Sequence, residues 1–274
     1  MSRTILNTML KGLNLLAIKD CYQQISEKCE KENLTFVDYL QELIQIETDK
    51  RQQRHVERLL KIAKLPRNKL LDQFDITRIP NLHPGMISNL GKGDFIDNYQ
   101  NILIFGNPGT GKSHLSIGLA RNWCMQGRKC LYISAANLIG QLIMAKTDSK
   151  LNKAIKSFDK IEVLIIDDIS YVPYGKSETD LLFHLLAERY EQRSTVITSN
   201  LAFSKWEQIF KDEMTAAAAI DRLVHHSIIL ELNTESYRIS AAKTKQPDLS
   251  TNHHDKKISS KINNYKKGVK NVKK

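Results

Sequence analysis

Long apolar runs and cysteine motifs are absent from this 274-residue sequence, and each absence excludes a class of protein. No apolar stretch approaches the roughly 20 residues that a membrane-spanning helix needs, and the N-terminus lacks the order of a signal peptide. We therefore expect a cytoplasmic protein that does not enter a membrane. The cysteines form no C-x-x-C pair and have no histidine at ligand spacing, so we predict neither a zinc site nor a disulfide framework. They are Cys21, Cys29, Cys124 and Cys130.

The adjacent pair His225-His226 is another pattern that could hold a metal or take part in acid–base chemistry. Neighbouring side chains on a regular helix or strand point apart, and no carboxylate motif accompanies this pair. The sequence therefore predicts no metal-binding or catalytic role for these two histidines.

Acidic residues are too few to balance the basic ones. Lysine and arginine number 41 against 30 aspartate and glutamate, which gives a formal net charge of +11. Such a charge raises the local concentration of polyanions, so it favours nucleic acid as a partner. From Lys243 onward the sequence is rich in lysine, asparagine and serine, and we expect residues 243–274 to form a basic, disordered tail.

A glycine-rich segment directly follows the apolar run 102–105 and fits the pattern G-x-x-x-x-G-K-[ST]. In this pattern the backbone N–H groups point at one anion, the lysine reaches the β- and γ-phosphates, and the serine holds Mg²⁺. Helical spacing after the lysine places a helix N-terminus at the same anion. The sequence thus predicts ATP and Mg²⁺ as ligands. The predicted nucleotide-binding residues are Gly106, Asn107, Pro108, Gly109, Thr110, Gly111, Lys112, Ser113 and His114.

The apolar run 163–166 ends in two carboxylates, Asp167 and Asp168. After a phosphate-binding loop, such a strand delivers its acids to the mouth of the nucleotide site. We expect Asp167 to hold Mg²⁺ together with Ser113, and Asp168 to polarise the attacking water. Taken alone, the same residues could be a plain strand that meets a solvated turn.

Asn200 follows the next apolar run, 195–198. Its amide could hydrogen-bond the γ-phosphate or the attacking water, so we add it to the catalytic set with Lys112, Asp167 and Asp168. The alternative is that Asn200 is simply a turn former, which is the more common role of a strand-end asparagine.

Arg222 lies in a helix-compatible stretch just before the last strand candidate. We predict that it is an arginine finger, because a planar cation supplied by a neighbouring subunit would make hydrolysis depend on assembly. Arg189 and Arg193 are rivals for this role. The structural alternative for Arg222 is a surface ion pair with Asp221 or Glu231.

Apolar strand candidates alternate with helical stretches, which predicts an α/β fold with a parallel sheet covered by helices on both faces. The candidates are 102–105, 130–133, 163–166, 195–198 and 228–232. Helical periodicity from Thr4 to about Lys31, and from Phe36 past Leu60, precedes them, and Thr35 with Asp38 predicts a capping box at the second start. We expect a helical DNA-binding domain at 1–70, a linker at 71–95, an ATPase core at 96–242 and the tail at 243–274.

Basic residues recur at spacings of three and four on the second N-terminal helix, which lines them along one face. They are Arg51, Arg54, Arg58 and Lys61. A second basic set lies between the second and third strands and comprises Lys146, Lys150, Lys153 and Lys160. Because neither set has interleaved aromatic residues, we expect contact with the backbone of duplex DNA. The alternative for both is a solvated amphipathic face.

Together these motifs resemble the AAA+ ATPases, and in particular the IstB-like transposition helper proteins, which are relatives of the DnaC-type helicase loaders. The resemblance covers residues from about 5 to 240 and rests on the motifs at 106–113, 164–168, 198–200 and 219–223. It implies a P-loop NTPase fold of the AAA+ type, an ATP-dependent homo-oligomer on double-stranded DNA, and partnership with a transposase.

The sequence departs from the wider AAA+ pattern in two places. Residues 234–242 are too few for the helical lid of many AAA+ proteins, so we expect that lid to be reduced or absent. Asp168 stands where many AAA+ members have glutamate, and its shorter reach changes where the attacking water would lie.

Our leading prediction is an ATP-dependent DNA-binding ATPase that assists a transposase in transposition. A replicative helicase loader would share every ATPase motif. A small-molecule phosphotransferase would need a substrate lid, and the charge, Asn200 and Arg222 argue against it. A nucleotide latch that does not hydrolyse ATP is the fourth possibility.

Overall fold

In the described part of the chain, five strands form one parallel sheet in the order β2-β3-β4-β1-β5. The computed structural model describes residues 3–80, 82–171, 175–202, 205–206, 213–234 and 236–237. Every strand overlaps one of the apolar runs, so the predicted parallel sheet is confirmed. The strands are β1 (Asn101–Phe105), β2 (Cys130–Ser134), β3 (Val163–Asp167), β4 (Ser194–Ser199) and β5 (Ser227–Glu231).

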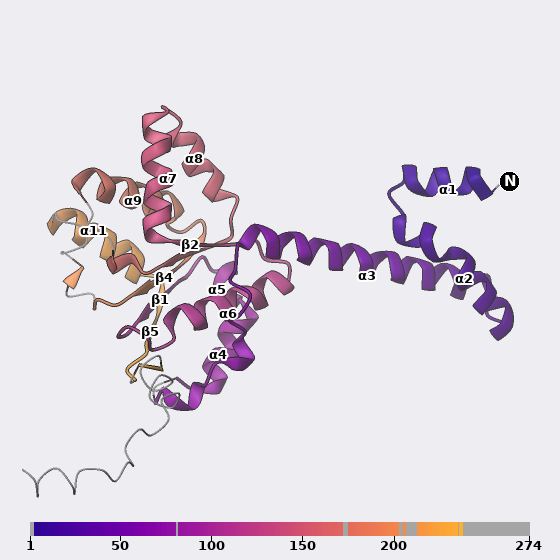
Figure 1. The fold of residues 1–274 in the computed structure, drawn as a ribbon, viewed down its shortest axis with the longest axis horizontal. Coiled ribbons are helices and arrows are strands. Elements are labelled where there is room, and N and C mark those ends of the chain that lie inside the picture. The colour runs from indigo at the N-terminus through magenta and orange to yellow at the C-terminus, as the bar shows by residue number, and fades with distance from the viewer. Residues whose placement is uncertain are drawn as a thin grey trace, which may run out of the picture. The chain divides into compact units, whose positions relative to one another are not determined.

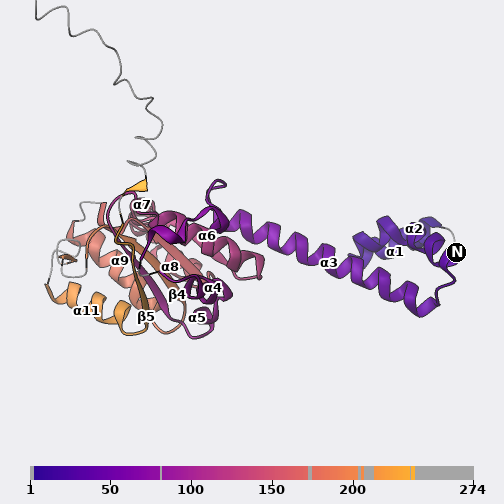
Figure 2. The same cartoon turned by 90° about the horizontal axis from the view of Figure 1, so that it is seen from below.

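Helices cover both faces of this sheet. Successive residues of a strand point to opposite faces, so each apolar strand contributes side chains to two cores. Leu103 and Ile166 pack into one core with helices of the first layer, and Ile104 and Ile165 pack into another with the second layer. Figures 1 and 2 show the sheet between the two layers. The first layer consists of α7 (Ala135–Thr147), α8 (Leu151–Asp159), α9 (Lys176–Arg189) and α11 (Glu213–Val224). The second consists of α4 (Pro84–Lys92), α5 (Asp94–Asp97), α6 (Lys112–Met125) and the end of α3 (Phe36–Ala63).

The segment 71–95, which we expected to be a linker, contributes to the second core. Its Ile79, Leu82 and Ile87 are buried there beside residues of α6. The segment contains α4 and two short 3₁₀ turns, Leu71–Gln73 and Ile76–Arg78. The segment therefore packs against the second layer of helices through these residues.

The N-terminal region consists of α1 (Arg3–Gly12), α2 (Leu16–Glu32) and α3. The helical stretch expected from Thr4 to about Lys31 is divided, because the chain turns after α1 and Asn14 adopts a positive φ of 56°. The capping box at the start of α3 is confirmed. The Thr35 N–H donates to Asp38 Oδ2 at 2.9 Å, and the Asp38 N–H donates to Thr35 Oγ1 at 3.2 Å.

A buried carboxylate joins α2 to α3. Glu47 of α3 is 4% exposed and accepts the N–H groups of Ala17 and Ile18 at 2.7 and 3.2 Å, at the start of α2. Burial alone would raise the pKa of the Glu47 carboxyl, but a hydrogen bond from Arg51 and those two N–H groups lower it overall. The charged form of Glu47 therefore stabilises the packing of α2 on α3.

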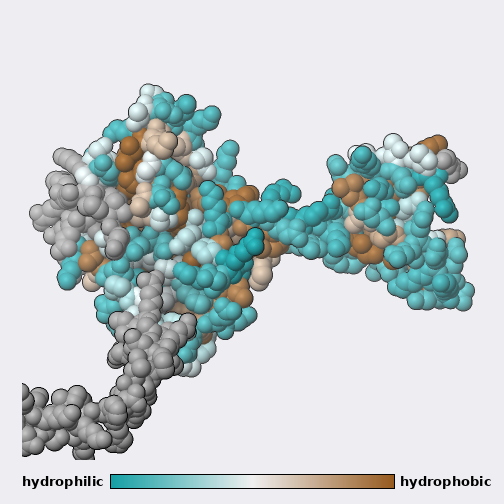
Figure 3. Space-filling view, viewed as in Figure 1, coloured by the Kyte–Doolittle hydropathy of each residue, from teal (hydrophilic) through white to brown (hydrophobic). Residues whose placement is uncertain are grey.

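Large apolar side chains remain exposed on the N-terminal helices, where Figure 3 shows apolar surface. Phe36, at the start of α3, is 95% exposed. Exposed apolar side chains that gather on one region can mark a site of protein interaction. We call this set the N-terminal apolar surface, and it comprises Ile5, Leu6, Met9, Leu13, Leu34, Phe36, Val37, Leu40 and Ile44.

Two expectations concern residues at the C-terminus. The expected basic tail at 243–274 lies outside the described residues, as does most of the stretch expected to be too short for a lid.

The four cysteines, all among the described residues, are free. No helix in the described ranges is long and apolar enough to cross a membrane.

Candidate functional site

The order of the strands brings four of the five predicted catalytic residues to the carboxyl end of the sheet, and Arg222 is the exception. β4 pairs with β1 on one side and with β3 on the other. The segments that follow these three strands are therefore neighbours at their carboxyl ends, which is where open α/β sheets bind ligands. Lys112, Asp168 and Asn200 meet at this edge, although they lie far apart in the sequence.

The loop after β1 has a backbone that only glycine adopts readily. Gly106 has φ 153°, and a Cβ there would lie 2.6 Å from the carbonyl oxygen of Leu232. Gly111 has φ 100°, and its Cβ would lie 2.8 Å from the Phe74 ring. Helix α6 begins at the next residue, Lys112, so its free N–H groups point into the loop. The loop and the helix together form an anion cradle.

Lys112 connects this loop to the end of β4. Its side chain is 7% exposed, and Nζ donates to the carbonyl oxygens of Gly106 and Asn107 at 2.7 and 3.0 Å. It also donates to Asn200 Oδ1. The ammonium group thus lies at the mouth of the loop, where a phosphate would bind.

Asp167 lies at the centre of a group of hydroxyls. Ser113 Oγ and Thr198 Oγ1 donate to Asp167 Oδ1 at 2.8 and 2.6 Å, and the Tyr132 hydroxyl donates to Oδ2 at 2.6 Å. Burial and this hydrogen bond raise the pKa of Tyr132, so its hydroxyl stays a donor. The Ser113 and Asp167 oxygens are hard ligands on adjacent elements, and this donor set fits Mg²⁺.

Asn200 orients Asp168 and contacts Lys112 at the same time. Its Nδ2 donates to Asp168 Oδ1 at 2.9 Å, while its Oδ1 accepts from Lys112. The Asp168 N–H donates to Thr198 Oγ1 at 2.8 Å, and Asp168 has a positive φ of 60°. Such a backbone is uncommon for a residue other than glycine and concentrates at functional sites.

Thr198 and Tyr132 are parts of the site that were not predicted from the sequence. Tyr132 lies in β2 and reaches Asp167 because β2 pairs with β3. Thr198 lies inside the motif at 198–200, but β4 also contains Ser194, Thr195 and Ser199, so its polarity did not single it out. Its 1% exposure and two hydrogen bonds explain why a hydroxyl occurs there.

The family whose description reads "IstB-like ATP binding protein" matches residues 8–245. The chain belongs to this family. It is 37% identical over 227 residues to a protein named for the insertion sequence IS5376 of Geobacillus stearothermophilus, covering 83% of this chain and 90% of that one. A relative named for IS21 of Pseudomonas aeruginosa is 35% identical over 234 residues, covering 85% of this chain and 88% of the other. Both relatives are named as ATP-binding proteins.

The fold of this IstB-like protein is similar to the folds of solved DnaC and DnaA structures. The DnaC helicase loader superposes with a TM-score of 0.52 and 17% identity, covering 60% of this chain and 97% of that one. DnaA from Aquifex aeolicus, bound to AMPPCP, superposes with a TM-score of 0.53 and 17% identity, covering 76% of this chain and 66% of DnaA. At this identity the likeness shows the fold alone, and it agrees with the predicted parallel sheet covered by helices.

Arg222 is not part of the cluster around Lys112 within one chain. It lies in the last turn of α11, where its guanidinium stacks over the Phe183 ring at 5.0 Å. Among the described side chains no ion pair joins it to Asp221 or Glu231, which were the structural alternatives. A role in catalysis would therefore require a second subunit.

The rival Arg189 has a structural role. It is 1% exposed and donates to the carbonyl oxygens of Phe158 and Ser194 at 2.8 and 2.7 Å, among others. Burial lowers the pKa of Arg189 to about 9. Because its donors bind the chain before β3 and the start of β4, Arg189 is not available to a neighbouring subunit. Arg193 donates to the carbonyl oxygen of Asp159 at 2.8 Å from a partly buried position.

His114, predicted to contact the nucleotide, faces the segment before α4 from the first turn of α6. Its Nε2 lies 2.7 Å from the carbonyl oxygen of Leu70, and its ring meets the edge of Phe74 at 5.6 Å between centroids. Phe74 also lies against Gly111. His114 therefore holds the 70–74 segment beside the phosphate loop.

The basic residues of α3 fall into two groups. Arg51 and Arg54 form ion pairs with Glu47 at 2.9 and 3.2 Å, so they also stabilise the packing of α2 on α3. Arg58 and Lys61 are exposed farther along the helix. Helical spacing alone predicted one surface stripe of all four residues, and it did not reveal the buried Glu47.

The second basic set lies around α7 and α8. Lys146 donates to Ser177 Oγ at 3.0 Å, and Lys150 lies 3.5 Å from Asp148. Lys153 is exposed on the first turn of α8, and Lys160 is exposed directly after that helix. Both contacts are at the surface, where ion pairs contribute little to stability. These lysines can exchange them for phosphate oxygens.

Proposed function

We propose that this IstB-like protein is an ATPase that assembles on duplex DNA and assists a transposase during transposition of an insertion sequence. The observation that carries the proposal is the hydrogen-bonded chain from Lys112 through Asn200 to Asp168 at the carboxyl edge of the sheet. It joins a phosphate-binding lysine to a carboxylate suited to activate water. The names of the relatives, which refer to insertion sequences, supply the biological setting.

The residues of the site divide the work of hydrolysis. The N–H groups of the loop and the Lys112 ammonium bind the β- and γ-phosphates, and Ser113 with Asp167 would hold Mg²⁺. When bound, Mg²⁺ supplies positive charge that offsets the negative charge developing on the phosphate oxygens. Asp168 orients the attacking water and accepts its proton. Asn200 holds the Asp168 carboxylate in place and, through Lys112, couples its position to the phosphates.

Arg222 would complete the site from a neighbouring subunit. Its guanidinium contacts an aromatic ring within its own chain, so it can turn towards a phosphate without breaking an ion pair among the described residues. Arginine fingers of this kind raise hydrolysis rates by about 10³–10⁵. Hydrolysis would then follow assembly. The N-terminal apolar surface supports self-association, because it leaves large side chains exposed in one chain.

Binding to DNA is supported by charge and exposure. The net charge of +11 favours a polyanion. Arg58, Lys61 and Lys153 are exposed on helices, where they can contact phosphates of the duplex backbone. We propose residues 1–70 as the DNA-binding domain and residues 96–242 as the ATPase core. Arg51 and Arg54 would contribute to the DNA surface while they hold α2 through Glu47.

Phosphate release with and without duplex DNA tests the proposal. The wild-type protein should release phosphate faster with DNA, and Asp168→Asn should abolish this release while it still binds ATP. Asp180→Asn, an exposed substitution on α9, is the matched control and should behave as wild type. Absence of phosphate release from the wild-type protein under all conditions would instead support a nucleotide latch. Co-purification with a replicative helicase and not with the transposase would support a helicase loader.

A further inference from the structure

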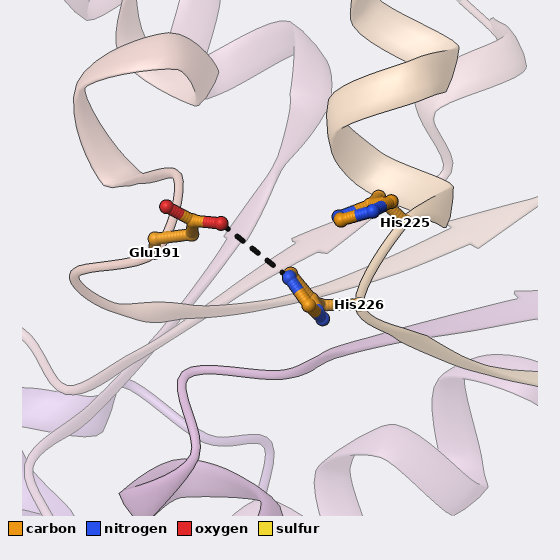
Figure 4. A group of neighbouring side chains, drawn as sticks. All are labelled: Glu191, His225 and His226. Carbon is orange, nitrogen blue, oxygen red and sulfur yellow. Dashed lines mark ion pairs between the residues drawn. The ribbon is translucent and has the colours of Figure 1, made fainter.

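Three side chains converge near the amino ends of β4 and β5. This end of the sheet is opposite the proposed ATP site, which lies at the carboxyl ends of the strands. Glu191, His225 and His226 each offer one ligand atom, and these atoms lie within 4.8 Å of one another. Figure 4 shows the Glu191 carboxylate facing His226, with His225 beside them. His226 Nε2 lies 3.4 Å from Glu191 Oε1, and the two imidazole centroids are 4.3 Å apart.

We propose that Glu191, His225 and His226 bind a divalent transition-metal ion, with Zn²⁺ as the best fit. Two imidazole nitrogens and one carboxylate oxygen are a donor set that Zn²⁺ accepts readily. Mg²⁺ prefers oxygen ligands throughout, so the ion at this site would differ from the one at Ser113 and Asp167. The fourth position of a tetrahedral ion would face solvent, because all three side chains are exposed.

The backbone explains why adjacent histidines converge here. The His225 N–H donates to the carbonyl oxygen of Asp221 at 3.0 Å and closes the last turn of α11. The His226 carbonyl oxygen accepts the Asn101 N–H at 2.7 Å, which fixes it beside β1. The pair thus spans a junction between a helix and a strand. The expectation that the two side chains point apart assumed one regular element, and it is wrong at this junction.

The third ligand is also fixed by its backbone. Glu191 adopts a positive φ of 55° in the turn between α9 and β4. The hydroxyl oxygen of the neighbouring Tyr190 lies 3.3 Å from His225 Nδ1. The Tyr190 ring stacks on the His226 ring, with 6.5 Å between centroids. Tyr190 can therefore orient both imidazoles, as partners of metal ligands do in established sites.

The distances allow closure on an ion with small side-chain movements. Metal–ligand bonds of about 2.0–2.2 Å place tetrahedral ligands about 3.4 Å apart. The pair Glu191 and His226 already has this separation, at 3.4 Å. The widest separation in the group is within 4.8 Å, and exposed side chains can rotate to shorten it. A bound ion would fasten the end of α11, which also carries Arg222, to the turn before β4.

Titration of the metal-free full-length protein with Zn²⁺, followed by calorimetry, tests this site. His253 and His254 form another adjacent pair near the C-terminus, so the double alanine variant at these positions is the background for every measurement. In that background we expect one Zn²⁺ per chain. His225→Ala and His226→Ala should each abolish stoichiometric binding, and Glu191→Gln should weaken it.

His184→Ala is the matched control. His184 is an exposed histidine 3.7 Å from a carboxylate, that of Glu188, but it has no third ligand among the described residues. This variant should bind Zn²⁺ as the background does. Zn²⁺ should raise the melting temperature of the background and of His184→Ala, and leave that of His226→Ala unchanged. Equal melting temperatures without Zn²⁺ show that the variants are folded.

Two results would overturn the inference. One is the absence of stoichiometric Zn²⁺ binding in the background protein. The other is undiminished binding after both His225 and His226 are replaced by alanine, because the ion would then lie elsewhere.

Discussion

Replacement of Thr198 by valine removes one hydroxyl and keeps the shape of the side chain. In the structure this hydroxyl donates to Asp167 Oδ1 at 2.6 Å and accepts the Asp168 N–H at 2.8 Å. It therefore fixes the Asp167 carboxylate directly and Asp168 through its backbone, and we assign both residues to hydrolysis. Thr198 is 1% exposed, so water cannot replace the missing hydroxyl without rearrangement.

The size of the effect follows from the charge of the acceptor. A hydrogen bond to a charged group contributes about 1.5–3 kcal/mol, and a buried N–H left without an acceptor costs about 1–3 kcal/mol. If the carboxylate at Asp167 needs this bond in the transition state, turnover falls about 10- to 100-fold, because about 1.4 kcal/mol corresponds to a factor of ten. We expect this decrease in kcat, with a smaller change in KM for ATP, since Lys112 and the loop remain intact.

Steady-state phosphate release at saturating DNA measures this decrease, and Thr195→Val is its control. Thr195 lies in the same strand, is buried, and its hydroxyl accepts a hydrogen bond from Arg189 Nε at 3.2 Å. Thr195→Val should lower the melting temperature but leave turnover per folded molecule unchanged. Thr198→Ser restores the hydroxyl and should recover most of the activity.

An equal fall in turnover in Thr198→Val and Thr195→Val would refute this reasoning. It would mean that activity follows the general stability of β4 and not the position of Asp167 and Asp168. Full turnover in Thr198→Val would show that Thr198 does not position the two carboxylates.

Three further predictions concern the N-terminal helices, the arginine finger and DNA. The folded-state pKa of Glu47 lies below its ordinary value, so the stability that the Glu47 carboxylate contributes is present at neutral pH and is lost as the pH falls through that lowered pKa. Protease cleavage in α2 should therefore rise on acidification. Glu47→Gln should already be cleaved readily at neutral pH. Arg222→Ala should bind ATP but not hydrolyse it on DNA. Mixing it with Asp168→Asn, which still binds ATP and keeps Arg222, should restore part of the rate, whereas a rate that mixing never restores contradicts a finger acting between subunits. Affinity for duplex DNA should fall less steeply with salt when Arg58 and Lys61 are both replaced by alanine. The slope of log affinity against log salt concentration should shrink by about 0.9 for each phosphate that the protein no longer neutralises. An unchanged slope would remove both residues from the DNA surface.

Much of the fold and the centre of the site could be predicted because their signals are local. The loop at 106–113 fits a pattern whose spacing is set by phosphate binding. The strand candidates stand out as apolar runs between polar turns. Asp167 and Asn200 could be inferred because each follows such a run. Parallel pairing then brings strand ends together, and β4 does lie between β1 and β3.

The remaining features depend on contacts between residues that are distant in the sequence. Glu47 reads as one more charge on an amphipathic helix, and only the packing of α2 shows that it is buried. Tyr132 reaches Asp167 across a strand pair, and Glu191 meets His226 across a turn and a helix end. No spacing rule within one segment predicts such contacts, because they depend on how the elements pack.

Sedimentation with a duplex DNA tests most directly whether ATP bound at Lys112 governs assembly. We predict that the wild-type protein forms large complexes with the duplex when ATP is present, and that Lys112→Ala does not. Large complexes of the same size from Lys112→Ala without any nucleotide would contradict nucleotide control of assembly.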